Sequence, residues 1–159
     1  MKTYTTDEMI IVLSKIDFDI TFLLEENRDI HVFNDIYRNI CKCEYENGDI
    51  VEVYNHKGYF LGKGYINDRS KITIRIMTKD IDEEIDEDFF KRRFKTAWEY
   101  RKKVIDTSSC RFIFGEADFL PGLTVDKFED YYVIQISTLG MDKYRDLIVK
   151  ILVEEYGAK

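Results

Sequence analysis

The sequence has one proline, three cysteines and two histidines among its 159 residues, and the few cysteines and histidines exclude some classes of protein. An odd number of cysteines does not suit a disulfide-stapled secreted scaffold. Cys41 and Cys43 are close in sequence, but no ligand cluster with zinc-site spacing accompanies them. No apolar run approaches the roughly 18 residues of a membrane span. The N-terminus has an acidic pair before a short apolar run, unlike a secretory signal. We therefore expect a reduced, cytoplasmic protein that makes no contact with a membrane.

Charge is plentiful but unevenly distributed along the chain. The net charge of −7 argues against nonspecific nucleic-acid binding by the whole surface. Residues 1–49 carry 5 basic and 11 acidic side chains, whereas residues 50–80 carry 6 and 3, and residues 89–103 carry 7 and 1. Charges farther apart than about 8–10 Å are screened at physiological salt, so a local basic patch can still bind phosphate.

The first half of the chain reads as a short helix followed by strands. Thr6 is a plausible N-cap for the helix, and Asp17–Leu24 alternates partly like a strand. Three strands are then expected over 50–54, 59–66 and 71–77, with turns at 55–58 and 67–70. Gly62 and Gly64 suit a bulge or a close backbone approach within the second strand. Such short strands with tight turns predict a small curled β-barrel or sheet.

The second half combines helices and strands. Residues 81–105 have apolar side chains at helical spacing, an acidic start and a basic end, which predicts a long amphipathic helix. Residues 107–109 mark a module boundary. Strands follow over 111–114, 123–125 and 131–136, and a helix over 142–156 closes the chain. The only proline, in Leu120-Pro121-Gly122-Leu123, predicts a tight turn. The resulting order, β-β-β-α-β-β-β-α, indicates the α+β class.

Few residues carry an obvious catalytic pattern. Gly62-Lys63-Gly64 lacks the third glycine of a nucleotide-binding loop and lies within a strand pattern. Glu116 and Asp118 could perform acid–base or metal chemistry, but we favour a structural role in which they bind backbone N–H groups or pair with Arg111. Cys110 has no neighbouring base to activate it, so a half-buried structural thiol is the better interpretation.

The strongest binding candidate from composition is the basic face of the predicted helix 81–105. A solvated helix face, paired in part with the acidic first turn, explains the same charges equally well. Basic residues of the β-module, interleaved with aromatic side chains, favour RNA somewhat, because rings can stack on bases. The candidate RNA-binding residues are Lys57, Lys63, Arg69, Lys71, Arg75, Lys91, Arg92, Lys95 and Lys102.

The segment RFIFGEADFLPGLTVD, residues 111–126, together with YVIQ at 132–135, resembles a segment of a known family. That family is the PUA-containing class I rRNA methyltransferases, which use S-adenosylmethionine to methylate C5 of a cytosine in large-subunit rRNA. Matching segments upstream are GDIVEVY at 48–54, GYFLGKG at 58–64, NDRSKITIR at 67–75 and DFF at 88–90. The resemblance covers about residues 30–159, with several separate motifs in the same order.

The resemblance implies two modules. Residues 30–80 would form a PUA-like RNA-binding module, a pseudo-barrel, and residues 81–159 the small α+β central domain that joins it to the catalytic domain. Nothing in the chain matches that catalytic domain, so the resemblance supplies no catalytic residue, no cofactor site and no metal site here. S-adenosylmethionine is expected only for the full-length family enzyme. Residues 25–34 are acidic where the family is basic and glycine-containing. The first 25 residues match nothing, and residues 1–29 stay an unassigned N-terminal segment.

The leading hypothesis is therefore an RNA-binding and linker portion of a methyltransferase, with rRNA as the partner. A rival hypothesis is a protein-interaction or homodimerisation module, which the net charge of −7 favours. A third is a self-contained enzyme that uses Glu116 and Asp118, and it would need a deep pocket lined by both carboxylates.

Overall fold

The computed structural model describes residues 45–54 and 59–159. The chain divides into two compact units, Met1–Ile81 and Asp82–Lys159, which are described separately below. The described residues form two three-stranded antiparallel sheets and three α-helices, in an order that confirms the predicted α+β class. Some predictions lie outside the described residues. They are the helix and strand before residue 45, the turn at 55–58, and the interpretation of Cys41 and Cys43.

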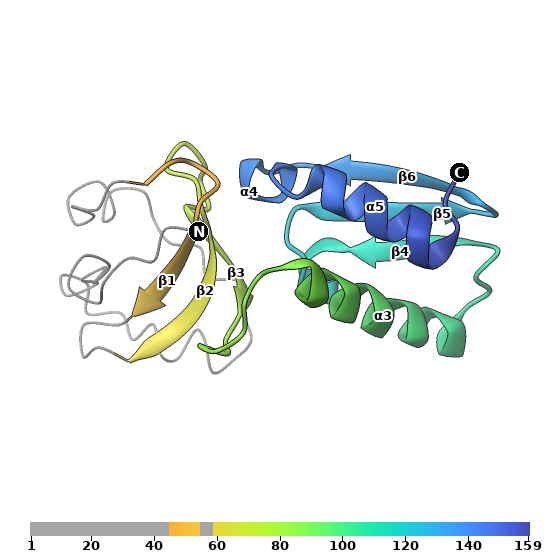
Figure 1. The fold of residues 1–159 in the computed structure, drawn as a ribbon, viewed down its shortest axis with the longest axis horizontal. Helices are drawn as coiled ribbons and strands as arrows, with labels where there is room; N and C mark the ends of the chain where they lie inside the picture. Colours follow the sequence, from red (N-terminus) through yellow and green to blue (C-terminus); the bar gives the residue numbers. More distant parts are fainter. Residues whose placement is uncertain (1–44, 55–58) are drawn as a thin grey trace. The chain divides into compact units, whose positions relative to one another are not determined.

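The first unit contains one sheet of order β1-β2-β3, with both strand pairs antiparallel. Its strands are β1 (Ile50–Tyr54), β2 (Phe60–Ile66) and β3 (Ile74–Thr78), drawn in orange to lime in Figure 1. The third strand begins three residues later than the sequence predicted. Among the described residues no pairing of β1 with β3 closes this sheet, so the barrel stays a prediction.

Gly64 allows β2 and β3 to approach each other closely. A Cβ atom at this position would overlap the backbone carbonyl of Arg75 on β3. The register between these strands shifts between Lys63 and Gly64, which is the irregularity that the glycines predicted. The sheet residues with the least exposure, Tyr65, Ile66 and Met77, form the core of this unit at about 1% exposure each.

The second unit begins with the long helix α3 (Glu87–Val104). It starts later than the predicted residue 81, because the carboxylate of Asp86 accepts a hydrogen bond from the Phe89 backbone N–H and caps the helix. Phe89, Phe90 and Phe94 are fully buried along the apolar stripe. Basic residues occupy the last turn, where they complement the helix dipole.

A second sheet of order β4-β5-β6 follows the helix. Its strands are β4 (Ser109–Phe114), β5 (Leu123–Phe128) and β6 (Tyr131–Ile136). Between β4 and β5 lies a short 3-10 helix, η1 (Gly115–Asp118), which the sequence reading missed. The proline turn is confirmed: the Leu123 N–H donates to the Leu120 carbonyl, and Gly122 has a φ of 80°.

Two helices end the chain where one was predicted. They are α4 (Leu139–Asp142) and α5 (Arg145–Tyr156), separated by Lys143 and Tyr144. Helices α3 and α5 lie on the same face of the second sheet, with α5 over its β6 side and α3 nearer β4 (Figure 1). Phe112 on β4 contacts the rings of Phe94 and Tyr156 from the two helices, so an aromatic cluster joins helices and sheet.

Candidate RNA-binding surface

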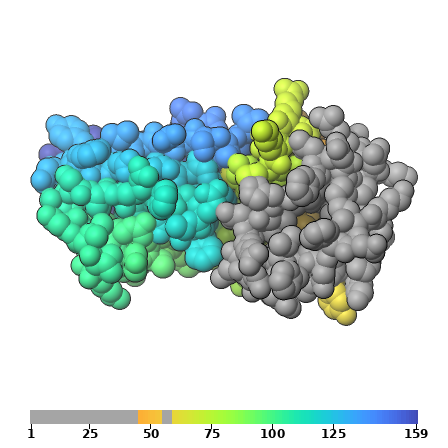
Figure 2. All heavy atoms as spheres, turned by 180° about the vertical axis from the view of Figure 1, so that it is seen from behind, coloured from red at the N-terminus to blue at the C-terminus, as the bar shows by residue number. Residues whose placement is uncertain are grey.

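The predicted binding residues of the first unit differ in exposure. Arg69 and Lys71 are exposed in the segment between β2 and β3, where the Ser70 N–H donates to the Asn67 carbonyl and closes the predicted turn. Figure 2 shows this segment, in yellow-green, projecting from the surface. These two side chains are therefore available to an external phosphate. Lys57 lies outside the described residues.

Lys63 is unsuited to direct RNA contact, because its side chain is 5% exposed. Its ammonium donates a hydrogen bond of 3.1 Å to the Ile81 carbonyl and lies 3.8 Å from the Glu52 carboxylate. A buried ammonium requires such partners. The alternation pattern alone could not reveal this placement, because every residue of β2 after Phe60 is buried, on both faces of the strand.

Arg75 is half-buried on β3 and partly engaged within its own unit. Its Nη1 donates to the Ile72 carbonyl at 3.2 Å, while its buried Nε has no hydrogen-bond partner among the described residues. The side chain therefore has one donor satisfied within the unit and one buried donor unsatisfied. Arg75 can contribute at most a peripheral contact.

The basic face of α3 is interleaved with carboxylates. Lys91 pairs with Glu87 at 2.9 Å and with Glu155 of α5 at 3.4 Å. Hydrogen bonding to Glu87 raises the pKa of Lys91 above its ordinary value. Hydrogen bonds from Lys150 and Lys91 lower the pKa of Glu87. Ion pairs thus link α3 to α5.

The remaining predicted cations of α3 differ in their partners. Arg92 is 56% exposed and pairs with Glu83 at 2.9 Å, and Lys102 pairs with Glu99 at 2.6 Å. Lys95 is exposed and forms no ion pair with another described residue. Among the predicted cations of α3, Lys95 is therefore the most available, whereas the others are paired with carboxylates.

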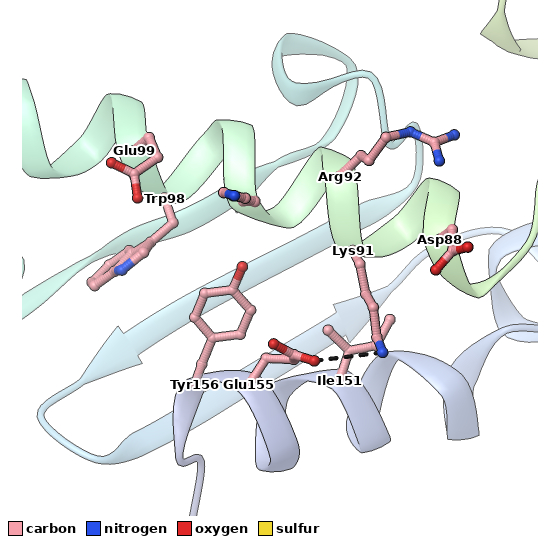
Figure 3. A pocket seen from close by; sticks show the side chains of 9 residues that line it. Asp88, Lys91, Arg92, Trp98, Glu99, Ile151, Glu155 and Tyr156 are labelled. Atoms are coloured by element: carbon pink, nitrogen blue, oxygen red, sulfur yellow. Dashed lines mark ion pairs between the residues drawn. The ribbon is translucent and has the colours of Figure 1, made fainter.

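An open pocket of about 430 Å³ lies between α3 and α5. Lys91, Arg92 and Lys95 line it together with the rings of Trp98 and Tyr156, as Figure 3 shows for the labelled side chains. Burial raises the pKa of the Tyr156 phenol to about 12, so it remains a neutral donor at physiological pH. The other residues that line the pocket are Asp88, Glu99, Ile151 and Glu155.

This mixture of cations, carboxylates and rings can bind a polar, partly aromatic group more readily than it can perform acid–base chemistry. Neither Trp98 nor Tyr156 is among the binding residues that the sequence predicts. Trp98 lies three residues after Lys95 and seven after Lys91 on one helix. This spacing could have shown that Trp98 lies beside the cations.

Asp118 has the structural role that was favoured, but with a different cation. Its carboxylate accepts a 2.6 Å hydrogen bond from the Phe114 backbone N–H and two bonds, of 3.0 and 2.6 Å, from the guanidinium of Arg101. Arg111 instead pairs with Asp126 across the β4–β5 ladder. The expectation of Arg111 as partner was wrong for Asp118, because the buried Arg101 reaches η1 from the last turn of α3.

The remaining candidates for catalytic or metal chemistry, Glu116, Asp118 and Cys110, lie within the described residues 45–54 and 59–159. No group of three or more potential metal ligands gathers in those ranges. Glu116 is exposed, whereas Asp118 is held by Arg101, so the two carboxylates do not line a common pocket. Burial raises the pKa of the half-buried Cys110 thiol, as a structural cysteine requires. None of the helices in this part of the chain could cross a membrane.

Residues 33–79 match the model of a family described as a PUA-like domain. Relatives named ribosomal RNA large subunit methyltransferase I also match. The protein of Shewanella frigidimarina is 39% identical over 134 residues, which are 82% of this chain and 34% of the relative. That of Alteromonas mediterranea is 42% identical over 105 residues, 64% of this chain and 26% of the relative. The chain thus spans about a third of the length of these relatives or less.

Two solved structures share the fold. One, described as a methyltransferase complexed with SAH, has a TM-score of 0.70 at 18% identity. The match covers 86% of this chain and 35% of the solved chain. The other, described as a SAM-dependent methyltransferase from Streptococcus mutans, has a TM-score of 0.73 at 16% identity. The match covers 94% of this chain and 38% of the solved chain. The sequence relatives and the match to a PUA-like domain show that this chain corresponds to the N-terminal, PUA-containing portion of the ribosomal RNA large subunit methyltransferase I family.

Proposed function

We propose that this chain is the RNA-binding and linker portion of an S-adenosylmethionine-dependent rRNA methyltransferase. The observation that carries the proposal is the 39% identity over 134 residues to a relative named as an rRNA methyltransferase. The match of residues 33–79 to a PUA-like domain supports an RNA-binding role within that portion. The partner is rRNA, and the methyl transfer itself belongs to a catalytic domain to which no residue of this chain is assigned.

The first module, residues 30–80, binds RNA as a small PUA-like barrel. Arg69 and Lys71 carry the contact within its described part, because both are exposed on the turn that follows β2. Cations two residues apart on a projecting turn can each reach a phosphate, and a backbone phosphate contact requires no particular base. Lys63 has no direct role in this contact, because it is buried against Glu52.

The second module adds a weaker electrostatic contact through α3. Lys95 can meet a phosphate directly, since no ion pair holds it among the described residues. Arg92 and Lys102 can exchange their carboxylate partners for phosphate at little cost, because exposed ion pairs stabilise proteins only slightly. A nucleobase that enters the neighbouring pocket would contact the rings of Trp98 and Tyr156.

The double variant Arg69→Ala/Lys71→Ala tests the proposal. We expect it to bind rRNA fragments more weakly and to lower the slope of log affinity against log salt by about 1.4–1.8, since each lost phosphate contact removes about 0.7–0.9. The matched control, Lys143→Ala/Arg145→Ala, removes the same charge from the α4–α5 region, where both side chains are exposed. Equal weakening by both variants would contradict a specific role for the β2–β3 turn.

A second double variant, Lys95→Ala/Lys102→Ala, separates the two modules. It should weaken binding less than the change at the β2–β3 turn, because Lys102 already shares its charge with Glu99. Isothermal titration or fluorescence anisotropy at fixed salt measures the difference. A larger effect at α3 would reverse the assignment and place the main contact on the second module.

A further inference from the structure

The β2–β3 turn, residues 67–71, is held by a residue far from it in the sequence. The Asn47 side-chain amide donates a hydrogen bond of 2.7 Å to the Asp68 carboxylate, and the Asp68 backbone N–H donates one of 2.9 Å to Asn47 Oδ1. Both side chains are half-buried. Two bonds between one pair of residues fix its orientation as well as its distance, and a bond to a charged acceptor is stronger than one between neutral groups. Asn47 therefore fastens the middle of this turn.

Backbone hydrogen bonds place the segment before β1 beside this turn. The Gly48 N–H donates to the Ile66 carbonyl at 2.6 Å, and the Ile66 N–H donates to the Asp49 carbonyl at 3.0 Å. In Figure 1 the orange segment before β1 lies next to the yellow-green loop that joins β2 and β3. The two bonds of Asn47 extend this attachment two residues beyond Ile66, into the turn itself.

The hydrogen bonds within the turn are longer than those from Asn47. The Arg69 N–H donates to the Asn67 side chain at 3.1 Å, and the Ser70 N–H donates to the Asn67 carbonyl at 3.2 Å. These lengths lie at the long end of the normal range for N–H donors. The bond of the Arg69 N–H is also exposed to water, which lowers its net contribution. The turn therefore depends on the Asn47 pair for a fixed shape.

The same pair determines where the charge of Asp68 lies. Asp68 precedes Arg69 in the chain, and a carboxylate that turned toward that guanidinium would compete with phosphate for it. The bond from Asn47 holds the carboxylate toward residue 47 instead. Within the described ranges no ion pair joins Arg69 or Lys71 to another residue. Asn47 thus keeps these cations available as well as holding the turn that carries them.

We propose that Asn47 is a positioning residue for RNA binding. Through Asp68 it holds the β2–β3 turn in the arrangement in which Arg69 and Lys71 meet phosphates, so this assignment rests on the proposed RNA contact of that turn. A turn that keeps the binding arrangement for only a fraction of the time has a dissociation constant raised by the inverse of that fraction. The number of phosphates contacted stays the same, so the salt dependence of binding does not change.

The variant Asn47→Ala separates positioning from contact. We expect its dissociation constant for rRNA fragments to rise about tenfold, as for a turn that is in place about a tenth of the time. The slope of log affinity against log salt should equal that of the natural chain. Arg69→Ala/Lys71→Ala lowers this slope instead, because it removes phosphate contacts. Fluorescence anisotropy across a salt series measures both quantities, and a lowered slope in Asn47→Ala would overturn the positioning role.

The swap variant Asn47→Asp/Asp68→Asn is the matched control. It keeps the net charge and can form both hydrogen bonds with the amide and the carboxylate exchanged, so its affinity should stay within about twofold of the natural value. Asn47→Asp alone sets two carboxylates against each other and should bind at least as weakly as Asn47→Ala. If Asn47→Ala does not fold, the comparison of the swap with Asn47→Asp decides. A swap variant that binds as weakly as the single variant would overturn the proposal.

Exchange of backbone amide hydrogens measures the hold on the turn without RNA. The Asp68 amide should be protected in the natural chain and in the swap variant, and should exchange faster in folded Asn47→Ala. An unprotected Asp68 amide in the natural chain, or an unchanged affinity of folded Asn47→Ala for rRNA fragments, would overturn the role of Asn47 alone. A natural chain that does not bind rRNA fragments at low salt would contradict the proposed function, and the role of Asn47 with it.

Discussion

Arg101 and Asp118 form an ion pair within the second unit. Both side chains are nearly buried, at 11% and 9% exposure, and the carboxylate also holds the Phe114 backbone N–H. Asp118→Ala would leave a guanidinium buried without its partner. We expect the free energy of unfolding to fall by about 3–5 kcal/mol, measured by urea denaturation.

The exposed pair of Arg111 and Asp126 provides the control for that experiment. Asp126→Ala removes a carboxylate that also holds an arginine, but in contact with solvent. Its free energy of unfolding should stay close to that of the natural chain, because exposed ion pairs contribute little. A comparable loss in both variants would show that burial is not what distinguishes Asp118.

Tyrosine ionisation gives a second prediction at the residue scale. Burial raises the pKa of Tyr54 and of Tyr156 from 10.0 to about 12. The unfolded chain releases the two phenol protons at lower pH than the folded chain does. The free energy of unfolding therefore keeps its full value below pH 10 and falls as the pH rises from 10 to about 12. Denaturation midpoints across this range measure the decline. The Tyr156→Phe variant should lose less stability over this pH range than the natural chain. An unchanged loss in that variant would contradict the raised pKa of Tyr156.

Among the elements, α3 depends on its N-terminal cap. The Asp86 carboxylate accepts the Phe89 N–H at 2.9 Å, which fixes the first turn. Asp86→Ala should lower the free energy of unfolding by about 1 kcal/mol, measured by denaturant titration. Asp86→Ser keeps a capping oxygen and should restore most of the loss. Equal loss in both variants would mean that the carboxylate acts through its charge rather than as a cap.

The pairing of β2 with β3 depends on the absence of a side chain at Gly64. A Cβ there would overlap the Arg75 carbonyl, so Gly64→Ala should separate the strands and destabilise the first unit by about 3 kcal/mol or more. Gly157→Ala is the comparison, because a Cβ added at Gly157 would have nothing within 4 Å. Only the positive φ of 69° would strain the alanine there. Thermal melting should rank Gly64→Ala as the more damaging change.

At the scale of the whole molecule, features set by local chemistry could be predicted from the sequence. The turn at Pro121 and the bounds of β6 follow from proline, glycine and alternation. Features set by tertiary packing could not. The burial of Lys63 depends on a carbonyl 18 residues away, and the partner of Asp118 lies 17 residues earlier in the sequence. The resemblance located the PUA-like region, whereas the RNA contacts stay a proposal.

The measurement that tests the central claim most directly is the affinity of the chain for large-subunit rRNA fragments across a salt series. Binding through several phosphates predicts a steep linear fall of log affinity with log salt, by about 0.7–0.9 for each contact. The Arg69→Ala/Lys71→Ala variant should show a shallower line than the Lys143→Ala/Arg145→Ala control. An affinity independent of salt, or no binding to rRNA fragments at low salt, would contradict the assignment of this chain as an RNA-binding portion.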